Sequence, residues 1–351
     1  MSLKTLLVGC GAISKKHIQA LIDNKETYDL AAVCDISEEN ARKAAAQYTD
    51  AGLPEPAFYS DYSEAVESAA PDVVAVATSS AFHHPIGMKA LAAGAHVVME
   101  KPIALSSVQA QELIDSAAKH SRKLTVCYIT RFAPHMRALK QKIDDGSFGR
   151  IFSGSVTVHW NRNDEYYRKA PWRGTWEKDG GALMNQCTHA IDLLQWFLGG
   201  DIQKVYGVIR RYLRPIESED FGSGIVQFGS GAIGTITGTV NVYPKNLDET
   251  LRIFGETGTV VIGGTHMDKV ETWQFADDAE YSAPEESLPG HSELYRDFAE
   301  AVEKDRDPVI CGIEGKKSVD IVLGIYKSMM EGCEVEHPFE FDTSLMKGSF
   351  V

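Results

Sequence analysis

The sequence predicts an α/β fold of two domains: an N-terminal doubly wound parallel sheet, and a C-terminal α+β domain with a large open, mainly antiparallel sheet. The first observation is length, because 351 residues exceed what one hydrophobic core usually organises. The second is the first third of the chain, where short apolar runs alternate with helical patterns, as in parallel strands joined by crossover helices. The third is a change after about Arg131 to alternating β-branched and aromatic residues between glycine turns.

The N-terminal domain is expected to comprise residues 1–128. Apolar runs give its expected strands, which are Thr5–Val8, Leu30–Cys34, Val73–Ala77, His96–Met99 and Leu124–Tyr128. Helical periodicity follows three of these runs, over Lys15–Asp23, Glu38–Tyr48 and Ser107–His120. This alternation predicts the parallel sheet.

The C-terminal domain is expected to comprise residues 129–351. After one helix that ends near Asp144, its expected strands are Gly154–Trp160, Val205–Leu213, Gly224–Phe228, Ala232–Val242, Leu251–Phe254 and Thr259–Ile262. An open sheet must cover both faces, and a second copy of the chain can cover one of them. We therefore expect a homodimer or homotetramer formed through the C-terminal sheet.

Composition excludes several classes of partner. The net charge of −14, with no block of consecutive Lys or Arg, disfavours nucleic acid. The six cysteines are scattered without the CxxC spacing of a zinc or redox site, so we expect no metal and a reducing compartment. The first residues lack a signal-peptide pattern and no apolar run reaches membrane-spanning length, which favours a cytoplasmic protein without a membrane partner.

A glycine-rich turn, Gly9–Ser14, follows the first expected strand and opens a helix. Backbone amides and the helix dipole at such a turn can bind a pyrophosphate, although a glycine turn without a ligand looks the same and Ser14 replaces the usual third glycine. Asp35 ends the second expected strand, where a carboxylate accepts hydrogen bonds from ribose hydroxyls and repels a 2′-phosphate. A Rossmann domain that prefers NAD to NADP is thus predicted, unless Asp35 is only a solvated strand-end acid. The expected cofactor contacts here are Gly9, Gly11, Ala12, Ile13 and Asp35.

Two further segments, Thr78–His83 and Glu100–Pro102, carry a family resemblance. They resemble the glucose-fructose oxidoreductase, inositol dehydrogenase and rhizopine-catabolism (Gfo/Idh/MocA) family, and the resemblance covers essentially the whole chain. It implies a cis peptide bond before Pro102. It also implies cofactor contacts for Thr78, Ser79, His83, Glu100 and Lys101; Ser79 stands where the family often has proline.

Lys101 is the first expected catalytic residue. An ammonium group partly desolvated beside the nicotinamide can hold the substrate hydroxyl and, with a lowered pKa, accept its proton. The alternative is a lysine at a strand end whose ammonium reaches solvent.

A second cluster extends from Asp179 to Asp192 and is expected to open a helix. Its apolar face would contain Met184, Cys187, Ile191, Leu194 and Leu198, with Asn185, His189 and Asp192 on a neighbouring stripe. The family usually has Asp-x-x-x-His here, so the resemblance implies that His189 contacts the reacting hydroxyl, while Asn185 replaces the carboxylate. Either neutral His189 is the base and Asn185 positions the substrate, or Lys101 alone carries the proton. The alternative is a helix histidine satisfied in the core.

Between the two clusters, residues 161–176 are dense in aromatic and arginine side chains, which suits a pocket wall, although an ordered loop in an oligomer interface has the same composition. The family resemblance implies that Trp172 and Arg173 contact the dinucleotide. Together with the Asp179–His189 pattern, the segment resembles the subgroup that oxidises UDP-N-acetylglucosaminuronate at the 3-hydroxyl. The expected substrate contacts are Lys101, Asn161, Tyr167, Arg173, Asn185 and His189.

The sequence therefore predicts an NAD-dependent dehydrogenase that oxidises a secondary hydroxyl of a sugar or nucleotide sugar, with Lys101 and His189 beside the nicotinamide. A free-sugar or inositol dehydrogenase is the alternative within the family. A non-catalytic NAD-responsive binding protein is the alternative from another class. His291 either approaches the substrate or faces solvent.

Overall fold

The computed structural model describes residues 2–199, 201–277, 280–282 and 290–350, which form two compact units. The described parts of the first unit are residues 2–104, 109–132 and 290–316; the others form the second unit. The sequence predicted a single boundary after residue 128, whereas the first unit also contains residues 290–316.

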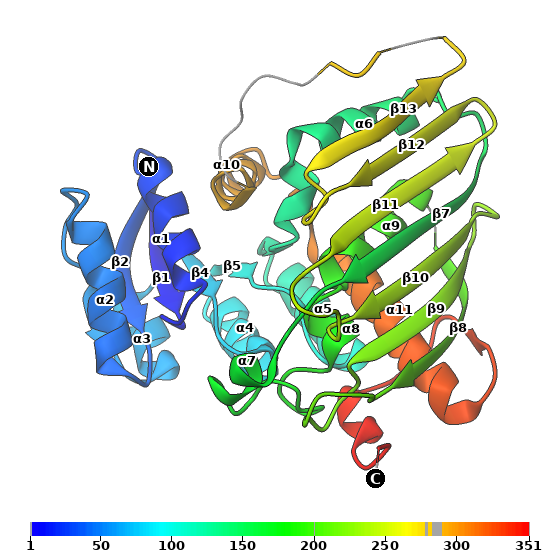
Figure 1. The fold of residues 1–351 in the computed structure, drawn as a ribbon. Helices are drawn as coiled ribbons and strands as arrows, with labels where there is room; N and C mark the ends of the chain where they lie inside the picture. Colours follow the sequence, from blue (N-terminus) through cyan, green and yellow to red (C-terminus); the bar gives the residue numbers. More distant parts are fainter. Residues whose placement is uncertain (1, 200, 278–279, 283–289, 351) are drawn as a thin grey trace. The chain divides into compact units, whose positions relative to one another are not determined.

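The first unit has a six-stranded parallel sheet in the order β3-β2-β1-β4-β5-β6 (Figure 1). Its strands are β1 (Leu3–Val8), β2 (Tyr28–Cys34), β3 (Ala57–Tyr59), β4 (Val73–Val76), β5 (His96–Met99) and β6 (Leu124–Val126). The strands are added in one direction from β1 to β3 and in the other from β4 to β6. This reversal of the strand order between β1 and β4 confirms the predicted doubly wound topology.

Helices and 3₁₀ turns connect these strands. They are α1 (Ser14–Asp23), α2 (Glu38–Thr49), α3 (Tyr62–Ala69), η1 (Ser80–Phe82), α4 (His83–Ala92), α5 (Ser107–Lys119) and η2 (Ile129–Phe132). Side chains cap two of them, because Ser37 accepts from the backbone N–H of Asn40 in α2 and Asp61 accepts from that of Glu64 in α3.

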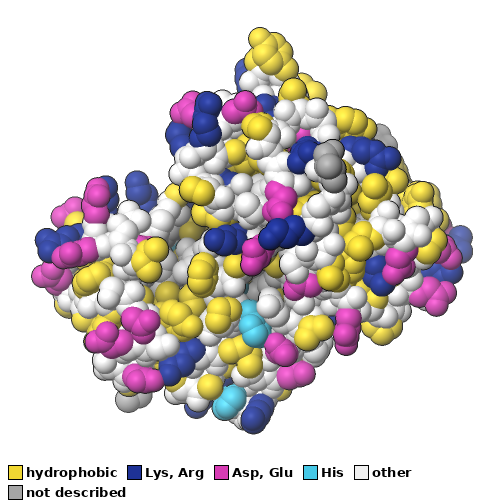
Figure 2. All heavy atoms as spheres, turned by 90° about the horizontal axis from the view of Figure 1, so that it is seen from below, with side chains coloured by type: hydrophobic (Ala, Val, Ile, Leu, Met, Phe, Trp, Pro, Cys, Tyr) yellow, Lys and Arg dark blue, Asp and Glu magenta, His cyan; other side chains and the backbone are white. Residues whose placement is uncertain are grey.

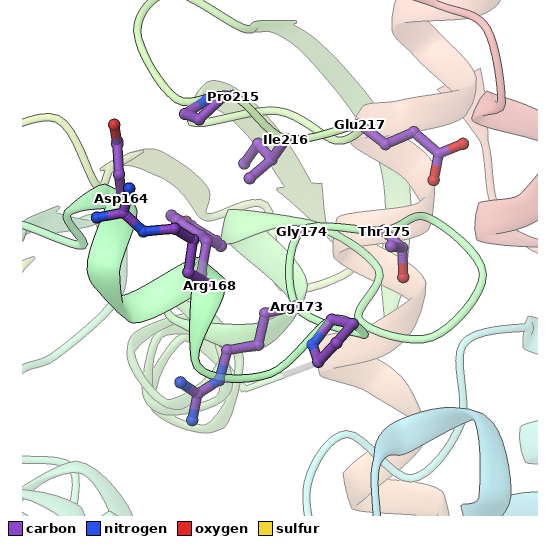
Figure 3. Close-up of a pocket in the computed structure, with 10 residues that line it drawn as sticks. Asp164, Arg168, Arg173, Gly174, Thr175, Pro215, Ile216 and Glu217 are labelled. Carbon is purple, nitrogen blue, oxygen red and sulfur yellow. The ribbon is translucent and has the colours of Figure 1, made fainter.

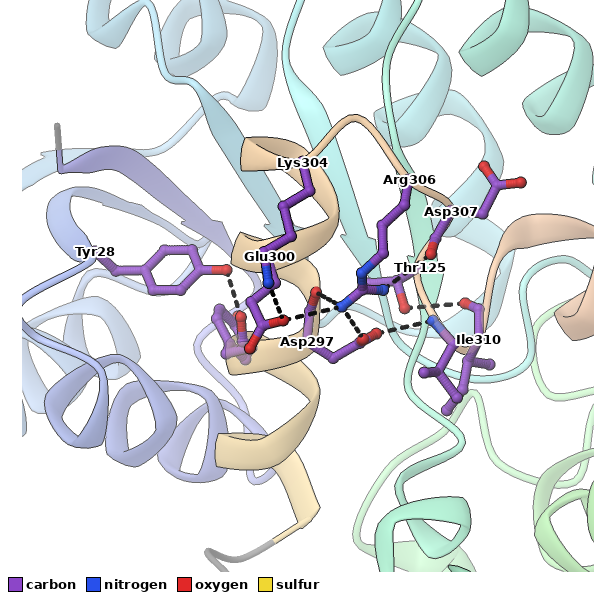
Figure 4. A network of polar contacts seen from close by, with 10 residues as sticks. Tyr28, Thr125, Asp297, Glu300, Lys304, Arg306, Asp307 and Ile310 are labelled. Atoms are coloured by element: carbon purple, nitrogen blue, oxygen red, sulfur yellow. Dashed lines mark hydrogen bonds and ion pairs between the residues drawn. The ribbon is translucent and has the colours of Figure 1, made fainter. Parts of the chain in front are cut away.

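Helix α10 (Gly290–Glu303) and the loop after it complete the first unit through buried polar contacts (Figure 4). The Tyr28 hydroxyl donates to the carbonyl of Tyr295 at 2.7 Å, and the Thr125 hydroxyl donates to that of Ile310 at 2.9 Å. Within the returning segment, Arg306 donates to the Asp297 carboxylate at 2.7 Å. The parallel sheet therefore depends on residues far along the chain.

The second unit has an eight-stranded sheet in the order β13-β12-β11-β7-β10-β9-β8-β14, antiparallel except between β7 and β10. Its strands are β7 (Ile151–His159), β8 (Ile202–Arg210), β9 (Phe221–Phe228), β10 (Ile233–Thr239), β11 (Asp248–Gly255), β12 (Gly258–Gly263), β13 (Lys269–Phe275) and β14 (Val335–Glu336). The predicted large, mainly antiparallel sheet is confirmed.

Helices cover one face of the second sheet (Figure 1). The remaining elements are α6 (Pro134–Asp144), α7 (Asp164–Arg168), α8 (Ala182–Asn185), α9 (Thr188–Leu198), α11 (Gly312–Glu331) and η3 (Thr343–Met346). Ile325 of α11 packs so closely on β8 and β9 that a Cβ at Gly207 or Gly224 would lie 2.6 Å from it. The opposite face exposes Tyr206, Ile225 and other apolar side chains.

The surface charges and the hydropathy of the helices can be compared with what the composition predicts. On the face seen in Figure 2, Lys and Arg side chains are interspersed with Asp and Glu. Among the described residues, every helix is too short or too polar to span a bilayer.

Candidate functional site

The expected cofactor residues of the first unit lie at the carboxyl ends of four neighbouring strands. Gly9 follows β1, Asp35 follows β2, Thr78 follows β4 and Glu100 follows β5. Because parallel strands end at one edge of their sheet, the structure brings these predicted residues together at the switch point between β1 and β4. Ligands of doubly wound sheets bind in this position.

The glycine turn has two glycines with different roles. Gly9 has φ +95°, and a Cβ there would lie 2.6 Å from the Ala77 carbonyl, so the fold itself requires glycine. A Cβ at Gly11 would lie more than 4 Å from every atom of the described residues beyond its two chain neighbours, so their packing leaves this position open. Ser14, the first residue of α1, donates its hydroxyl to the Gly11 carbonyl at 2.6 Å. Exposed glycine backbone beside a helix N-terminus fits a pyrophosphate.

The Asp35 carboxylate is held against this turn. One oxygen accepts from the backbone N–H of Cys10 and the other from that of Ser37, each at 2.7 Å. These bonds fix the carboxylate at the end of β2, where the predicted ribose contact requires it.

A buried histidine joins the two family segments. His83 Nδ1 lies 2.7 Å from the Pro102 carbonyl oxygen, and its Nε2 lies 3.2 Å from that of Thr78. Burial lowers the pKa of His83, so the neutral ring donates through one nitrogen, and the shorter contact favours Nδ1. The peptide bond between Lys101 and Pro102 is cis, as the resemblance implied. His83 thus fixes the backbone at Thr78 and at Pro102, one residue in each of the two family segments.

Glu100 turns its carboxylate into the first unit, where it is 7% exposed. His17 Nε2 and His291 Nε2 each lie 3.1 Å from its Oε1. Burial opposes ionisation, but these two hydrogen bonds hold the pKa of Glu100 well below its usual value. The ligand atoms of His17, Glu100, Cys127 and His291 lie within 4.8 Å of one another, so these four residues could hold a metal. Of the two alternatives given for His291, exposure to solvent is wrong, since the residue is buried.

In the second unit, the predicted helix over residues 179–192 is two helices. Helix α8 ends at Asn185, and α9 begins at Thr188. Asn185 and His189 therefore belong to different helices, instead of lying one turn apart on a single helix. The expected apolar face is nevertheless buried throughout, at Met184, Cys187, Ile191, Leu194 and Leu198.

A hydrogen-bond network holds Asn185. Its amide donates to buried Asp179, whose other oxygen accepts from the backbone N–H of Gly174 at 2.6 Å. The Gln186 amide donates to the Asn185 carbonyl at 3.1 Å and to the Tyr166 hydroxyl at 3.0 Å. Asn185 is thus oriented by a carboxylate even though it replaces one.

The arginine and aromatic residues predicted as a pocket wall pack on one another. The Arg173 guanidinium lies 4.0 Å above the Tyr166 ring and donates to the Tyr166 carbonyl at 2.9 Å. Arg162 lies over Trp160 and donates to Gln186 at 2.7 Å. Arg173 also lines a cavity of about 270 Å³ with Asp164, Arg168 and Glu217 (Figure 3).

Each unit therefore gathers its own predicted residues. The second contains Asn161, Tyr167, Trp172, Arg173, Asn185 and His189, and their substrate and cofactor contacts stay predictions. Sequence reasoning did not identify the residues that position the predicted ones: in the first unit His17, which contacts Glu100, and in the second Tyr166, Asp179 and Gln186. One signal for His17 was available: a histidine beside Ile18 on the apolar side of α1 needs a buried partner.

Family models match both parts of the chain. Residues 3–128 match the oxidoreductase family with an NAD-binding Rossmann fold, and residues 136–261 match the Gfo/Idh/MocA C-terminal domain. The chain belongs to the Gfo/Idh/MocA oxidoreductase family. This confirms the resemblance, the fold class and an NAD-binding Rossmann domain in a dehydrogenase of the sugar oxidoreductase family.

Solved structures of the family align over nearly the whole chain. The WlbA dehydrogenase of Bordetella pertussis, in complex with NADH and UDP-GlcNAcA, is 33% identical, covers 97% of this chain and 100% of its own, and has a TM-score of 0.87. WlbA of Chromobacterium violaceum, with the same two ligands, is 32% identical, covers 97% of each chain and has a TM-score of 0.86.

A curated relative is named as an inositol dehydrogenase. The inositol 2-dehydrogenase/D-chiro-inositol 3-dehydrogenase of Lactiplantibacillus plantarum is 30% identical over 205 residues, which are 58% of this chain and 54% of that protein. The match thus spans about half of the relative.

One buried carboxyl near the Asn185 network gives stability a pH dependence. Glu219 accepts from the Leu183 backbone N–H at 2.8 Å and the Tyr326 hydroxyl at 2.7 Å, and burial raises its pKa to about 8. The folded protein keeps this proton after the unfolded chain has lost it. The contribution to stability is therefore complete below about pH 4.5 and falls as pH rises to about 8.

Glu219→Gln is expected to remove this dependence, because glutamine does not ionise. The variant should gain stability over wild type between pH 5 and 8, by about 1–3 kcal/mol. Denaturant unfolding across this range measures the gain, with Glu217→Gln as the neighbouring control. A difference that stays constant with pH would contradict the expectation.

Proposed function

We propose that this protein is an NAD-dependent dehydrogenase that oxidises the 3-hydroxyl of UDP-N-acetylglucosaminuronate or a closely similar nucleotide sugar. The likeness to WlbA, at 33% identity over 97% of this chain, carries the proposal. The arginine and aromatic side chains around Tyr166 support it, since guanidinium groups bind phosphate and aromatic rings stack on base or sugar.

In the proposed reaction, the glycine turn and Asp35 would hold NAD, which would supply the acceptor for the hydride of the carbon that bears the hydroxyl. Lys101 holds the hydroxyl and takes or relays its proton, either alone or with neutral His189. Asn185, oriented by Asp179, holds the substrate. Asn161, Tyr167 and Arg173 complete the substrate contacts.

The substrate proposal is tested by following reduced nicotinamide with UDP-N-acetylglucosaminuronate, the free uronate, glucose and myo-inositol. We expect kcat/KM for the nucleotide sugar to exceed that for the free uronate at least ~100-fold, since the nucleotide supplies binding energy remote from the reacting carbon. Substrate deuterated at C3 should yield deuterated NADH. Reduction by inositol alone would show that the alternative, an inositol dehydrogenase, is correct.

NAD is proposed over NADP because of Asp35, whose carboxylate is fixed at the glycine turn. Asp35→Ser should lower the ratio of kcat/KM for NAD to that for NADP by about 10–100-fold, because a negative charge that repels the 2′-phosphate is lost. Asp29→Ser, on exposed β2 surface, is the control. An unchanged ratio would mean that Asp35 does not select the cofactor.

We also propose that a second copy of the chain covers the open face of the second sheet. Tyr206, Val208, Ile225 and Ile233 expose between 38% and 49% of their surface there. Ile225→Glu should reduce the mass measured by light scattering to that of a monomer, because a charge would be buried in the interface. Ile313→Glu, another exposed isoleucine, is the control. A monomeric wild type would refute the proposal.

A further inference from the structure

The carboxylate of Glu100 connects three segments of the first unit. His17 reaches it from α1, the helix that follows the glycine turn, and His291 reaches it from the start of α10. Both imidazoles bind Oε1, while Oε2 accepts from the backbone N–H of Lys101 at 3.2 Å. Glu100 thus lies between the glycine-turn helix and the backbone of the expected catalytic lysine.

The protons in this cluster can be assigned. An ionised carboxylate only accepts, so both histidines donate through Nε2–H. His17 Nδ1 is then an acceptor and accepts a hydrogen bond from the Tyr295 hydroxyl at 2.9 Å. The Cys127 thiol belongs to the same cluster, in which the ligand atoms lie within 4.8 Å of one another, so three hydrogen-bond donors and a thiol surround the carboxylate.

These donors explain why a buried charge is tolerated here, since a buried carboxylate is costly unless it is hydrogen-bonded. A metal among the four residues would need both Nε2 atoms without protons, and the two hydrogen bonds to Oε1 would be lost. The two hydrogen bonds at 3.1 Å and a bound metal are therefore alternatives that exclude one another, and metal analysis of the purified protein distinguishes them.

We propose that Glu100 is a positioning residue: its buried carboxylate, held by His17 and His291, fixes the Lys101 backbone relative to α1 and the glycine turn. The proposal rests on the proposed function, because Lys101 matters only if it acts on the reacting hydroxyl. A displacement of about 1 Å at a catalytic group can cost about 100-fold in rate. Glu100 would therefore affect the chemical step without touching the substrate.

Glu100→Gln tests this with nearly unchanged side-chain volume. The new amide must place an NH₂ group against either the histidines or the Lys101 N–H, which leaves donors facing donors. We expect kcat to fall 10–100-fold, KM for the substrate to change less than threefold, and the isotope effect with substrate deuterated at the reacting carbon to increase. Glu112→Gln, which alters an exposed His–Glu pair at His84, should change none of these.

Two substitutions of His291 separate the hydrogen bond from packing. His291→Gln keeps a donor for Oε1 and should retain kcat within about threefold, whereas His291→Leu removes it and should lower kcat about tenfold. Equal losses in both variants would overturn the proposal. Stoichiometric metal in the purified wild type, lost in Glu100→Gln, would also overturn it.

A readout without turnover distinguishes this proposal from the proposed function. Amide hydrogen exchange of a peptide containing Lys101 should be at least tenfold faster in Glu100→Gln than in wild type, with a peptide from β9 unchanged. If the wild type oxidises no nucleotide sugar but this acceleration is found, the proposed function fails and the positioning of Lys101 stands. Unchanged exchange at Lys101 would overturn the positioning whatever the substrate.

Discussion

Lys101→Met should lower kcat by about 10²–10⁴, the usual contribution of one group in general acid–base catalysis. Methionine keeps much of the length and apolar surface of lysine but cannot hold or accept the proton of the reacting hydroxyl. Single-turnover measurement of reduced nicotinamide reports the chemical step directly. NAD affinity, measured by fluorescence titration, should change less than about tenfold, because the glycine turn and Asp35 are intact.

Lys43→Met is the matched control, since Lys43 forms an exposed pair with Glu39 on α2. A kcat for Lys101→Met within threefold of wild type would contradict the proposed role. If the wild type turns over none of the candidate sugars, the alternative of an NAD-responsive protein without turnover is favoured instead. His189→Gln extends the test: whichever of the two variants loses the ionisation limb of the pH profile of kcat/KM identifies the base.

Gly9→Ala should lower the free energy of unfolding by about 2–4 kcal/mol, from backbone strain and overpacking together. Its φ of +95° is unfavourable for alanine, and the added methyl would lie 2.6 Å from the Ala77 carbonyl. Denaturant unfolding with and without NAD measures the loss. We expect most of it to be present without NAD, because the clash is within the protein.

Gly11→Ala is the matched comparison on the same turn. Its methyl group would meet no atom within 4 Å in the part of the chain that the structure describes, so stability without ligand should stay within about 0.5 kcal/mol of wild type. NAD affinity should nevertheless fall at least ~10-fold, since the methyl would occupy the space where a pyrophosphate approaches the backbone. Equal effects of the two substitutions on stability, or unchanged NAD affinity in Gly11→Ala, would refute this division of roles.

The sequence predicted most strands of both sheets because their apolar patterns are local. The short strands β3 and β14 were missed, since three and two residues carry no periodicity. Strand β13 (Lys269–Phe275) was missed as well. The break between α8 and α9 was missed for the opposite reason, because the apolar period continues through Cys187 although the helix does not. Hydrophobic spacing reports which face is buried, not whether each backbone hydrogen bond is made.

In the candidate site, too, some neighbours could be predicted from the sequence and others could not. Residues after parallel strands could be predicted as neighbours, because topology alone places strand ends together. The partners of Glu100 could not, since His17 and His291 are 83 and 191 residues away from it. Likewise, nothing in the spacing of Asp179 and Asn185 shows that their side chains share a hydrogen bond.

The return of residues 290–316 to the first unit has a consequence for synthesis. Translation proceeds from the N-terminus, and domains made of one continuous segment fold as they emerge. Here the hydroxyls of Tyr28 and Thr125 donate to the carbonyls of Tyr295 and Ile310. These two acceptors are synthesised after most strands of the second sheet. The nucleotide-binding half is therefore completed late, and a gene truncated at residue 132 encodes an unfinished domain.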